Sequence, residues 1–156
     1  MKVDFEWLED NVMLTKLSAE ELQHLDEALE IKEYSPGEEI MHEGQPGGQL
    51  FILRSGEAEI SHVAHGEKVE IAKVSEGALL GEMTFLTGEP ASAEVIALTP
   101  CVAYRLTRAS YSMLMQSHQD MVYSLFAYML VHAASIIRRM NEEHVILKQY
   151  VLNSNK

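Results

Sequence analysis

The segment 81–95 carries the most chemically informative residues of the chain. It contains three carboxylates and no basic side chain. These carboxylates belong to Glu82, Glu89 and Glu94. A segment with this charge repels an anion, so an anionic ligand bound here must find its positive charge elsewhere in the fold. Without such a base, the segment is interpreted as a turn of fixed shape in which Phe85 and Leu86 fill the core.

Other combinations of reactive side chains do not stand out. The chain has seven histidines but no His-x-His motif and no pair of histidines four residues apart on a predicted helix, so no metal site is predicted. No order of Ser, His and Asp or of Cys and His indicates a nucleophile, so no catalytic residue is predicted and the protein is not expected to be an enzyme. Cys101 is the single cysteine, which excludes an internal disulfide and is typical of a cytoplasmic protein. It is predicted to be a small, buried apolar residue.

The elements that position these residues begin with helices. Ser18 and Glu21 have the spacing of a capping box, with Ser18 as the N-cap. Leucines follow at helical intervals, at Leu22, Leu25 and Leu29. The pattern predicts a helix over about 18–29, preceded by a shorter one between Phe5 and Met13.

A region of short strands follows, from Ile31 to Leu106. Glycine and proline turn signals recur about every 8–12 residues, which indicates an antiparallel sandwich or barrel. Polar and apolar residues alternate over 57–63 and 69–74, on either side of Gly66. The two runs predict a β-hairpin.

The last third of the chain is predicted to be helical. Thr107 can cap a short helix that ends near Met115, and a long helix follows over about 118–150. Apolar residues recur along it at alternating steps of three and four, which is typical of a coiled-coil seam of about three heptads. The seam comprises Phe126, Met129, Ala133, Ile136, Met140, Glu143, Leu147 and Tyr150. It predicts a homodimer, while a second stripe faces the helix's own domain. That stripe comprises Val122, Leu125, Leu130 and Ile137.

Three motifs in the strand region resemble those of cyclic nucleotide-binding domains. Gly81-Glu82, followed by Pro90, Ser92, Ala93 and Val95, is similar to the family's phosphate-binding cassette. The runs 36–44 and 50–60 are similar to the family's first strands and turns. The resemblance spans about residues 15–140. It implies an eight-stranded β-roll, that is, a jelly-roll-like double-stranded β-helix, followed by a long C-terminal dimerisation helix.

The resemblance also implies a set of ligand-binding residues. The glutamate of Gly81-Glu82 accepts a bond from the ribose 2′-hydroxyl, and the cassette's backbone amides and an arginine hold the cyclic phosphate. In this chain Ala91 occupies the arginine position, and Arg54 is the substitute base considered. The implied site comprises Gly81, Glu82, Met83, Thr84, Ala91, Ser92 and Arg54. The family's base-reading region falls near Ile136-Ile137, with Ser135 as the nearest hydroxyl.

Length and charge set further bounds. A chain of 156 residues is expected to form a single domain, with N-terminal helices over 1–30, a β-roll over 31–106 and C-terminal helices over 107–150. The net charge of −12 argues against DNA as a partner, and only six residues follow Tyr150, too few for a winged helix. No apolar run is expected to approach the ~20 residues of a membrane helix.

The sequence therefore predicts a non-catalytic regulatory or sensor module in the cytoplasm that signals to an unidentified effector protein. Losing two charge-assisted bonds with the arginine weakens cyclic AMP or cyclic GMP binding by about two to four decades. Weak or absent binding of these nucleotides is the preferred interpretation. A genuine cyclic-nucleotide receptor with another base, a ligand-free dimerisation or protein-docking module, and a site for a different small ligand remain alternatives.

Overall fold

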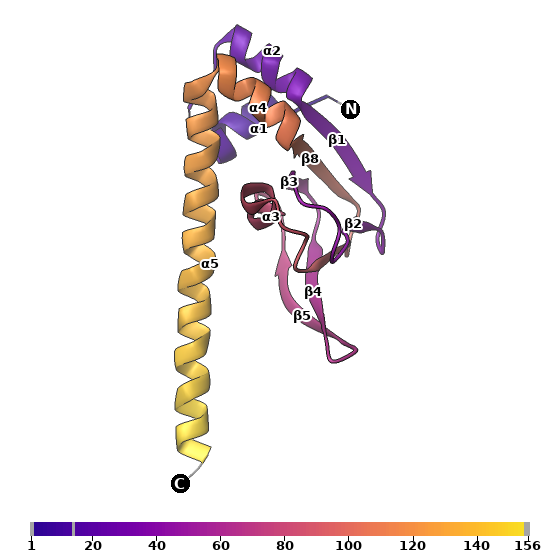
Figure 1. Cartoon of the computed structure of the whole chain (residues 1–156), viewed down its shortest axis with the longest axis vertical. Helices are drawn as coiled ribbons and strands as arrows, with labels where there is room; N and C mark the ends of the chain where they lie inside the picture. Colours follow the sequence, from indigo (N-terminus) through magenta and orange to yellow (C-terminus); the bar gives the residue numbers. More distant parts are fainter. Residues whose placement is uncertain (1, 14, 155–156) are drawn as a thin grey trace.

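The computed structural model describes residues 2–13 and 15–154 (Figure 1). Eight strands form two antiparallel sheets with the orders β1-β8-β3-β6 and β2-β7-β4-β5. The strands are β1 (Leu29–Tyr34), β2 (Glu39–Met41), β3 (Gln49–Ser55), β4 (Ala58–Ala64), β5 (Glu67–Val74), β6 (Leu79–Leu80), β7 (Glu94–Ala97) and β8 (Cys101–Thr107). The predicted eight-stranded roll is confirmed.

Helices cover one side of the roll, and one further helix lies in the connection between β6 and β7. They are α1 (Phe5–Leu8), the π-helical turn η1 (Glu9–Met13), α2 (Ala19–Ala28), α3 (Glu82–Thr87), α4 (Arg108–Ser117) and α5 (Gln119–Ser154). The capping box of α2 is formed: the Glu21 amide donates to Ser18 Oγ at 3.3 Å, and the Ser18 amide donates to the Glu21 carboxylate at 2.8 Å. Thr107 caps α4 through the amide of Ser110.

The predicted hairpin is formed by β4 and β5, which pair from Ala58–Val74 to Ala64–Glu67. Its two-residue turn consists of His65 and Gly66, with φ values of 55° and 85°. Positive φ at both central positions defines the type I′ turn, whose twist matches that of the flanking strands.

Two apolar cores explain why β3 is buried on both faces. One core lies between the sheets and includes Phe51 and Leu53. The other lies between the first sheet and the helices and includes Leu50 and Ile52. Successive side chains of a strand point to opposite faces, so neighbouring β3 residues enter different cores.

Helix α5 packs on the second core through its N-terminal half only. Met121, Val122, Leu125 and Met129 are buried there. The assignment of Met129 to the dimer seam is therefore wrong, because a side chain that is 1% exposed cannot contact a partner. The C-terminal part of α5 extends past the β4–β5 hairpin (Figure 1).

The exposed apolar stripe of α5 combines residues of both predicted stripes. Leu130 and Ile137, expected to face the roll, are more than half exposed and do not. Together with exposed residues of the predicted seam and with Val151, they keep the steps of three, four or seven residues that a heptad pattern requires. We call this set the α5 stripe: Phe126, Leu130, Ile137, Met140, Leu147 and Val151.

Truncation of Met129 is expected to destabilise the fold. Met129→Ala removes a buried side chain where α5 meets the helical core, and such changes cost about 2–5 kcal/mol. Urea denaturation followed by circular dichroism measures the loss. Met113→Ala, at an exposed position of α4, is the matched control and should change the free energy of unfolding by less than about 0.5 kcal/mol. Equal stability of the two variants would contradict the placement of Met129.

Within the described residues, the segment Gln119–Asn153 is long and apolar enough to cross a membrane, judged by length and composition alone. The expectation that no apolar run approaches this length is therefore wrong. The same helix packs against the roll and carries Arg138, Arg139, Glu142 and Glu143 further along. Charges at these positions oppose burial of the helix in the hydrocarbon of a membrane. We therefore keep the prediction that the protein has no membrane partner.

Candidate functional site

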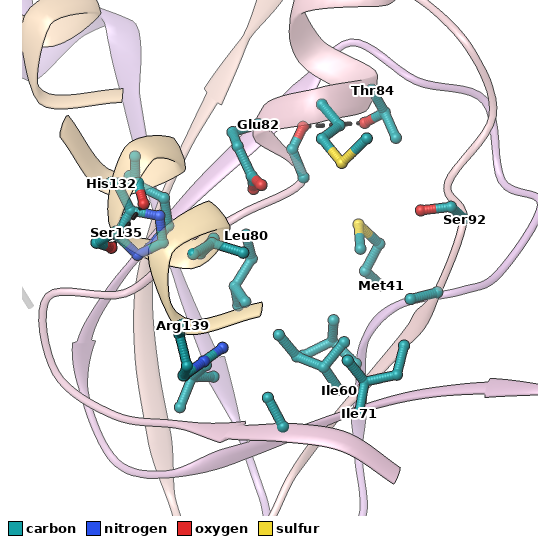
Figure 2. A pocket seen from close by; sticks show the side chains of 18 residues that line it. Met41, Ile60, Ile71, Leu80, Glu82, Thr84, Ser92, His132, Ser135 and Arg139 are labelled. Atoms are coloured by element: carbon teal, nitrogen blue, oxygen red, sulfur yellow. Dashed lines mark hydrogen bonds between the residues drawn. The ribbon is translucent and has the colours of Figure 1, made fainter. Parts of the chain in front are cut away.

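A cavity of about 480 Å³ lies between the roll, the start of α3 and one face of α5 (Figure 2). Its walls are mainly apolar. Strand residues include Met41, Ile60, Ile71, Val74, Leu80 and Val95. The polar lining side chains are Glu82, Thr84, Ser92, His132, Ser135 and Arg139. The volume and the apolar walls suit a small organic molecule whose orientation is set by a few polar groups.

Backbone geometry at Gly81 starts the helix α3 at one end of this cavity. Gly81 has a φ of 76°, and a Cβ there would lie 2.7 Å from the carbonyl oxygen of Gln49. Both constraints require glycine. The Gly81 carbonyl accepts bonds from the Phe85 amide at 2.8 Å and from Thr84 Oγ1 at 3.0 Å. The first amides of α3 have no partner within the helix and are therefore able to bind a ligand.

Arg108 fixes the other end of α3. Its guanidinium Nη2 donates to the carbonyl oxygens of Phe85 and of Leu86, the latter at 2.9 Å. A cation at these carbonyls also complements the helix dipole. Arg108 is the first residue of α4, so it joins this helix directly to the cassette. The sequence gives no local signal for this role, because the partners of Arg108 lie 22 and 23 residues away.

The structure brings most residues of the implied site together. Gly81, Glu82, Met83, Thr84 and Ser92 line the cavity. Ala91 is 4% exposed and lies in the core between the sheets rather than on the cavity wall. Its backbone is held by the turn before β3, since its carbonyl accepts from the Gly44 amide and its amide donates to the Gln45 carbonyl.

Arg54 lies outside the cavity and does not occupy the place of the missing arginine. Its guanidinium contacts Asp4 at 2.8 Å and Glu76 at 3.1 Å, and it stacks 4.9 Å from the centre of the Trp7 ring. The Arg54 guanidinium beside Asp4 lowers the pKa of that carboxyl. These contacts assign Arg54 to anchoring the N-terminal helix on the roll.

Helix α5 contributes His132, Ser135, Ile136 and Arg139 to the cavity. The family resemblance implies a base-reading region near Ile136, and His132 and Arg139 are further residues of the same face that it did not include. The spacing of His132, Ile136 and Arg139 indicates that they lie together, because residues i, i+4 and i+7 share one helix face. Arg139 is the basic side chain in the lining, and it lies across the cavity from Ser92 (Figure 2). Ser135 Oγ donates to the His132 carbonyl.

The surroundings of His132 favour the neutral form of its imidazole. Burial lowers the pKa of His132, the charge of Arg139 lowers it further, and Glu82 opposes both. The Leu79 amide points at His132 Nε2 over 3.5 Å, which leaves the proton on Nδ1. That nitrogen is buried and has no hydrogen-bond partner among the described residues. A ligand in the cavity could bond to this nitrogen only after the imidazole ring rotates.

Acid should destabilise the domain partly through His132. Because the pKa is lowered in the folded state, the unfolded chain binds this proton more readily, so stability is retained above the ordinary pKa of about 6.5 and falls as the pH drops below it. Urea denaturation at pH 7.5 and pH 5.5 measures how much unfolding free energy is lost on acidification. His132→Asn should lose less of it than the unmodified chain. His65→Asn is the control, since the exposed turn residue tolerates asparagine at positive φ, and it should lose as much as the unmodified chain. An unchanged loss in His132→Asn would contradict this role.

Comparison with known proteins identifies the family. The family model described as "Cyclic nucleotide-binding domain" matches residues 31–118, which cover more than half of the chain. The chain therefore belongs to the cyclic nucleotide-binding domain family. The match includes almost the whole roll and the segment 81–95, which contributes residues to the cavity described above.

Three similar proteins place the chain among regulatory domains. A cAMP-dependent protein kinase regulatory subunit from Mycosarcoma maydis is 34% identical over 91 residues, which cover 58% of this chain and 17% of that protein. A cyclic nucleotide-binding domain from Methylobacillus flagellatus KT superposes with a TM-score of 0.78 at 25% identity, over 92% of this chain and 83% of that one. The regulatory subunit of a cAMP-independent protein kinase A from Trypanosoma cruzi, bound to guanosine, superposes with a TM-score of 0.63 at 25% identity, over 85% and 49% of the two chains.

The chain spans about a fifth of the length of the first kinase regulatory subunits that it matches. The comparisons therefore establish membership of the cyclic nucleotide-binding domain family over residues 31–118.

Proposed function

We propose that this domain is a non-catalytic sensor that binds cyclic AMP and cyclic GMP weakly or not at all. The observation that carries the proposal is the buried Ala91 where the family has its phosphate-binding arginine. The segment 81–95 contains no other base, and Arg54 is held by Asp4 and Glu76. A cyclic phosphate would therefore face the carboxylate of Glu82 without a compensating cation at the cassette.

The preferred ligand is a neutral molecule of nucleoside type. Glu82 can accept bonds from vicinal hydroxyls of a ribose, because an ionised carboxylate forms strong bonds with hydroxyl donors. The apolar strand residues that line the cavity offer apolar contacts to a base. The guanosine bound by the Trypanosoma cruzi protein, whose kinase is described as cAMP-independent, supports this ligand class.

A bound ligand would act on α5. The cavity is lined both by the cassette and by His132, Ile136 and Arg139 of this helix. A molecule that contacts both walls changes the free energy of α5 packing against the roll, and a ligand can shift a conformational equilibrium only through such differential contacts. The movement of α5 is the signal that an effector protein would receive.

Titration calorimetry with cyclic AMP, cyclic GMP, adenosine and guanosine tests the proposal. We expect a nucleoside to bind at least about tenfold more tightly than either cyclic nucleotide, and Glu82→Gln to weaken that binding by about tenfold or more. Low-micromolar binding of cyclic AMP by the unmodified chain would overturn the proposal. Arg139→Gln would then test the basic residue in the cavity.

The α5 stripe supports a second proposal, that the domain dimerises through this helix. The stripe remains exposed in one copy of the chain and continues over about 25 residues, from Phe126 to Val151. A second copy in parallel would cover it with an identical stripe. This proposal does not depend on the ligand, so the domain would also serve as a ligand-free dimerisation module if the cavity stayed empty.

A further inference from the structure

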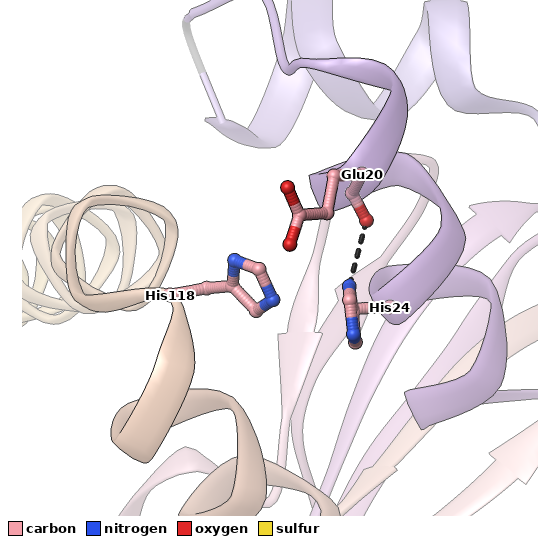
Figure 3. A group of neighbouring side chains, drawn as sticks. All are labelled: Glu20, His24 and His118. Atoms are coloured by element: carbon pink, nitrogen blue, oxygen red, sulfur yellow. Dashed lines mark hydrogen bonds between the residues drawn. The ribbon is translucent and has the colours of Figure 1, made fainter.

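A cluster of two histidines and a glutamate joins α2 to the junction of α4 and α5 (Figure 3). Glu20 and His24 are one helical turn apart on α2, and His118 lies between α4 and α5. Each residue offers a ligand atom, and these atoms lie within 4.8 Å of one another. The two imidazole rings have their centres 4.2 Å apart.

Each histidine has a ring nitrogen for which no hydrogen-bond partner is found among the described residues. His24 Nδ1 lies 2.8 Å from the Glu20 backbone carbonyl, so this nitrogen donates and Nε2 keeps its lone pair. Histidines that bind metals commonly donate their other N–H to a carbonyl in this way. His118 Nε2 is buried and has no hydrogen-bond partner among the described residues. A bound cation would satisfy this nitrogen.

The surroundings also favour a cation. The adjoining cavity of about 530 Å³ has no Lys or Arg in its lining. It is lined by Ser18, Glu20, Glu21, Gln116, Ser117, His118, Gln119 and Asp120. Within the described part of the chain, Glu20, His24 and His118 form no ion pair, so no side-chain cation competes for the site.

We propose that Glu20, His24 and His118 bind a divalent transition-metal ion of the Zn²⁺ type, with water in the remaining position. Two imidazole nitrogens and one carboxylate oxygen form a donor set that zinc accepts, whereas calcium and magnesium prefer oxygen ligands alone. Neighbouring ligand atoms around tetrahedral zinc are about 3.3 Å apart, given bonds of about 2.0 Å. The ligand atoms, which lie within 4.8 Å of one another, would have to move closer together by side-chain rotation to reach this spacing.

A second group with similar residue types does not share these features. Glu39, His42 and Glu94 also lie close together, but Glu94 contacts the ammonium of Lys68 at 2.8 Å and Glu39 contacts His42. A metal ion there would have to displace an existing cation. His42 therefore provides a matched control for the histidines of the proposed site.

The position of His118 gives the ion a regulatory consequence. The His118 amide donates to the Leu114 carbonyl at the end of α4, and the His118 carbonyl accepts from the Val122 amide in the first turn of α5. An ion held by this residue and by α2 would fix the angle at which α5 leaves the roll. Metal binding would restrain the helix movement through which the domain signals.

Calorimetric titration of the EDTA-treated full chain with ZnCl₂, in the absence of any nucleotide, tests the site. We expect one ion per chain, and a loss of affinity of at least about 100-fold in His24→Gln and in His118→Gln. His42→Gln should bind as the unmodified chain does, and MgCl₂ should produce no saturable binding. Because no ligand occupies the cavity in this experiment, its failure would leave the proposed nucleoside binding unaffected.

Folding and coordination are checked separately. Circular dichroism without metal establishes that each variant folds, and Glu20→Gln, at an exposed position of α2, serves if a histidine variant does not; it should weaken zinc binding by about tenfold or more. Co²⁺ in place of zinc should give visible absorption of tetrahedral type that the folded variant lacks. Absence of saturable zinc binding, or equal affinity in the unmodified chain and the folded variants, would overturn the proposal.

Discussion

Ala91→Arg is expected to raise the affinity of the domain for cyclic AMP by about two to four decades. A guanidinium at this position can form two charge-assisted bonds with the cyclic phosphate, each contributing about 1.5–3 kcal/mol, and each decade of affinity corresponds to about 1.4 kcal/mol. The rest of the cassette is in place, since Glu82 and Ser92 line the cavity. Titration calorimetry of both proteins with cyclic AMP measures the gain.

The structure indicates how the new side chain would fit. The backbone of residue 91 is fixed by two hydrogen bonds to the turn at Gly44 and Gln45, so the substitution should not displace it. Ala91 itself is buried in the core between the sheets, and the guanidinium must extend out of this core to reach the cavity. Glu89 and Glu94 are the acids nearest in sequence, and Glu94 already contacts Lys68 at 2.8 Å. It therefore competes only in part for the new arginine.

Ala91→Met is the matched control for this substitution. Its side chain has comparable length and no charge, so it reproduces the packing change without the phosphate bonds. Cyclic AMP affinity should stay at the level of the unmodified chain. If Ala91→Arg folds, as judged by circular dichroism, and binds no better than Ala91→Met, the missing arginine is not the reason for weak binding.

The fold was largely predictable because its local signals are strong. The capping box at Ser18, the turn at Gly66 and the cap at Thr107 each involve residues at most three apart, so sequence spacing alone defines them. The cassette was located by its resemblance to a known family. Residues whose roles depend on neighbours close in sequence were therefore placed correctly.

Roles that depend on tertiary partners could not be read from spacing. Arg54 is as basic as a phosphate ligand must be, but Asp4, 50 residues away, decides its position. Along α5, the two apolar stripes have the same steps of three and four, and only packing shows that Met129 faces the roll while Leu130 faces away. The cluster at His118 was missed because it draws on residues that are almost a hundred positions apart.

The same packing defines which part of α5 can associate. The α5 stripe lies beside the residues that contact the roll, so one helix can serve its own domain and a partner at once. Met140 is at the centre of the stripe, is 59% exposed and lies beyond the buried half of the helix. It is therefore the position at which a substitution would test assembly without disturbing the core.

Met140→Lys is expected to convert the proposed dimer into monomers. In a parallel helix pair, two ammonium groups would meet in an apolar seam, and desolvation alone costs several kcal/mol per ion. We expect the dimerisation constant to fall by at least about three decades. Sedimentation equilibrium at micromolar concentration measures this, and a circular dichroism melt shows whether the monomer remains folded.

Met113→Lys is the matched control, because it introduces the same charge at an exposed methionine of α4 that is outside the α5 stripe. It should leave the mass of the dimer unchanged. Co-sedimentation of the unmodified chain with lipid vesicles separates assembly from membrane insertion, since the stripe of a dimer is covered and should not bind lipid. A monomeric unmodified chain, or a dimer that withstands Met140→Lys, would show that α5 does not hold two copies together.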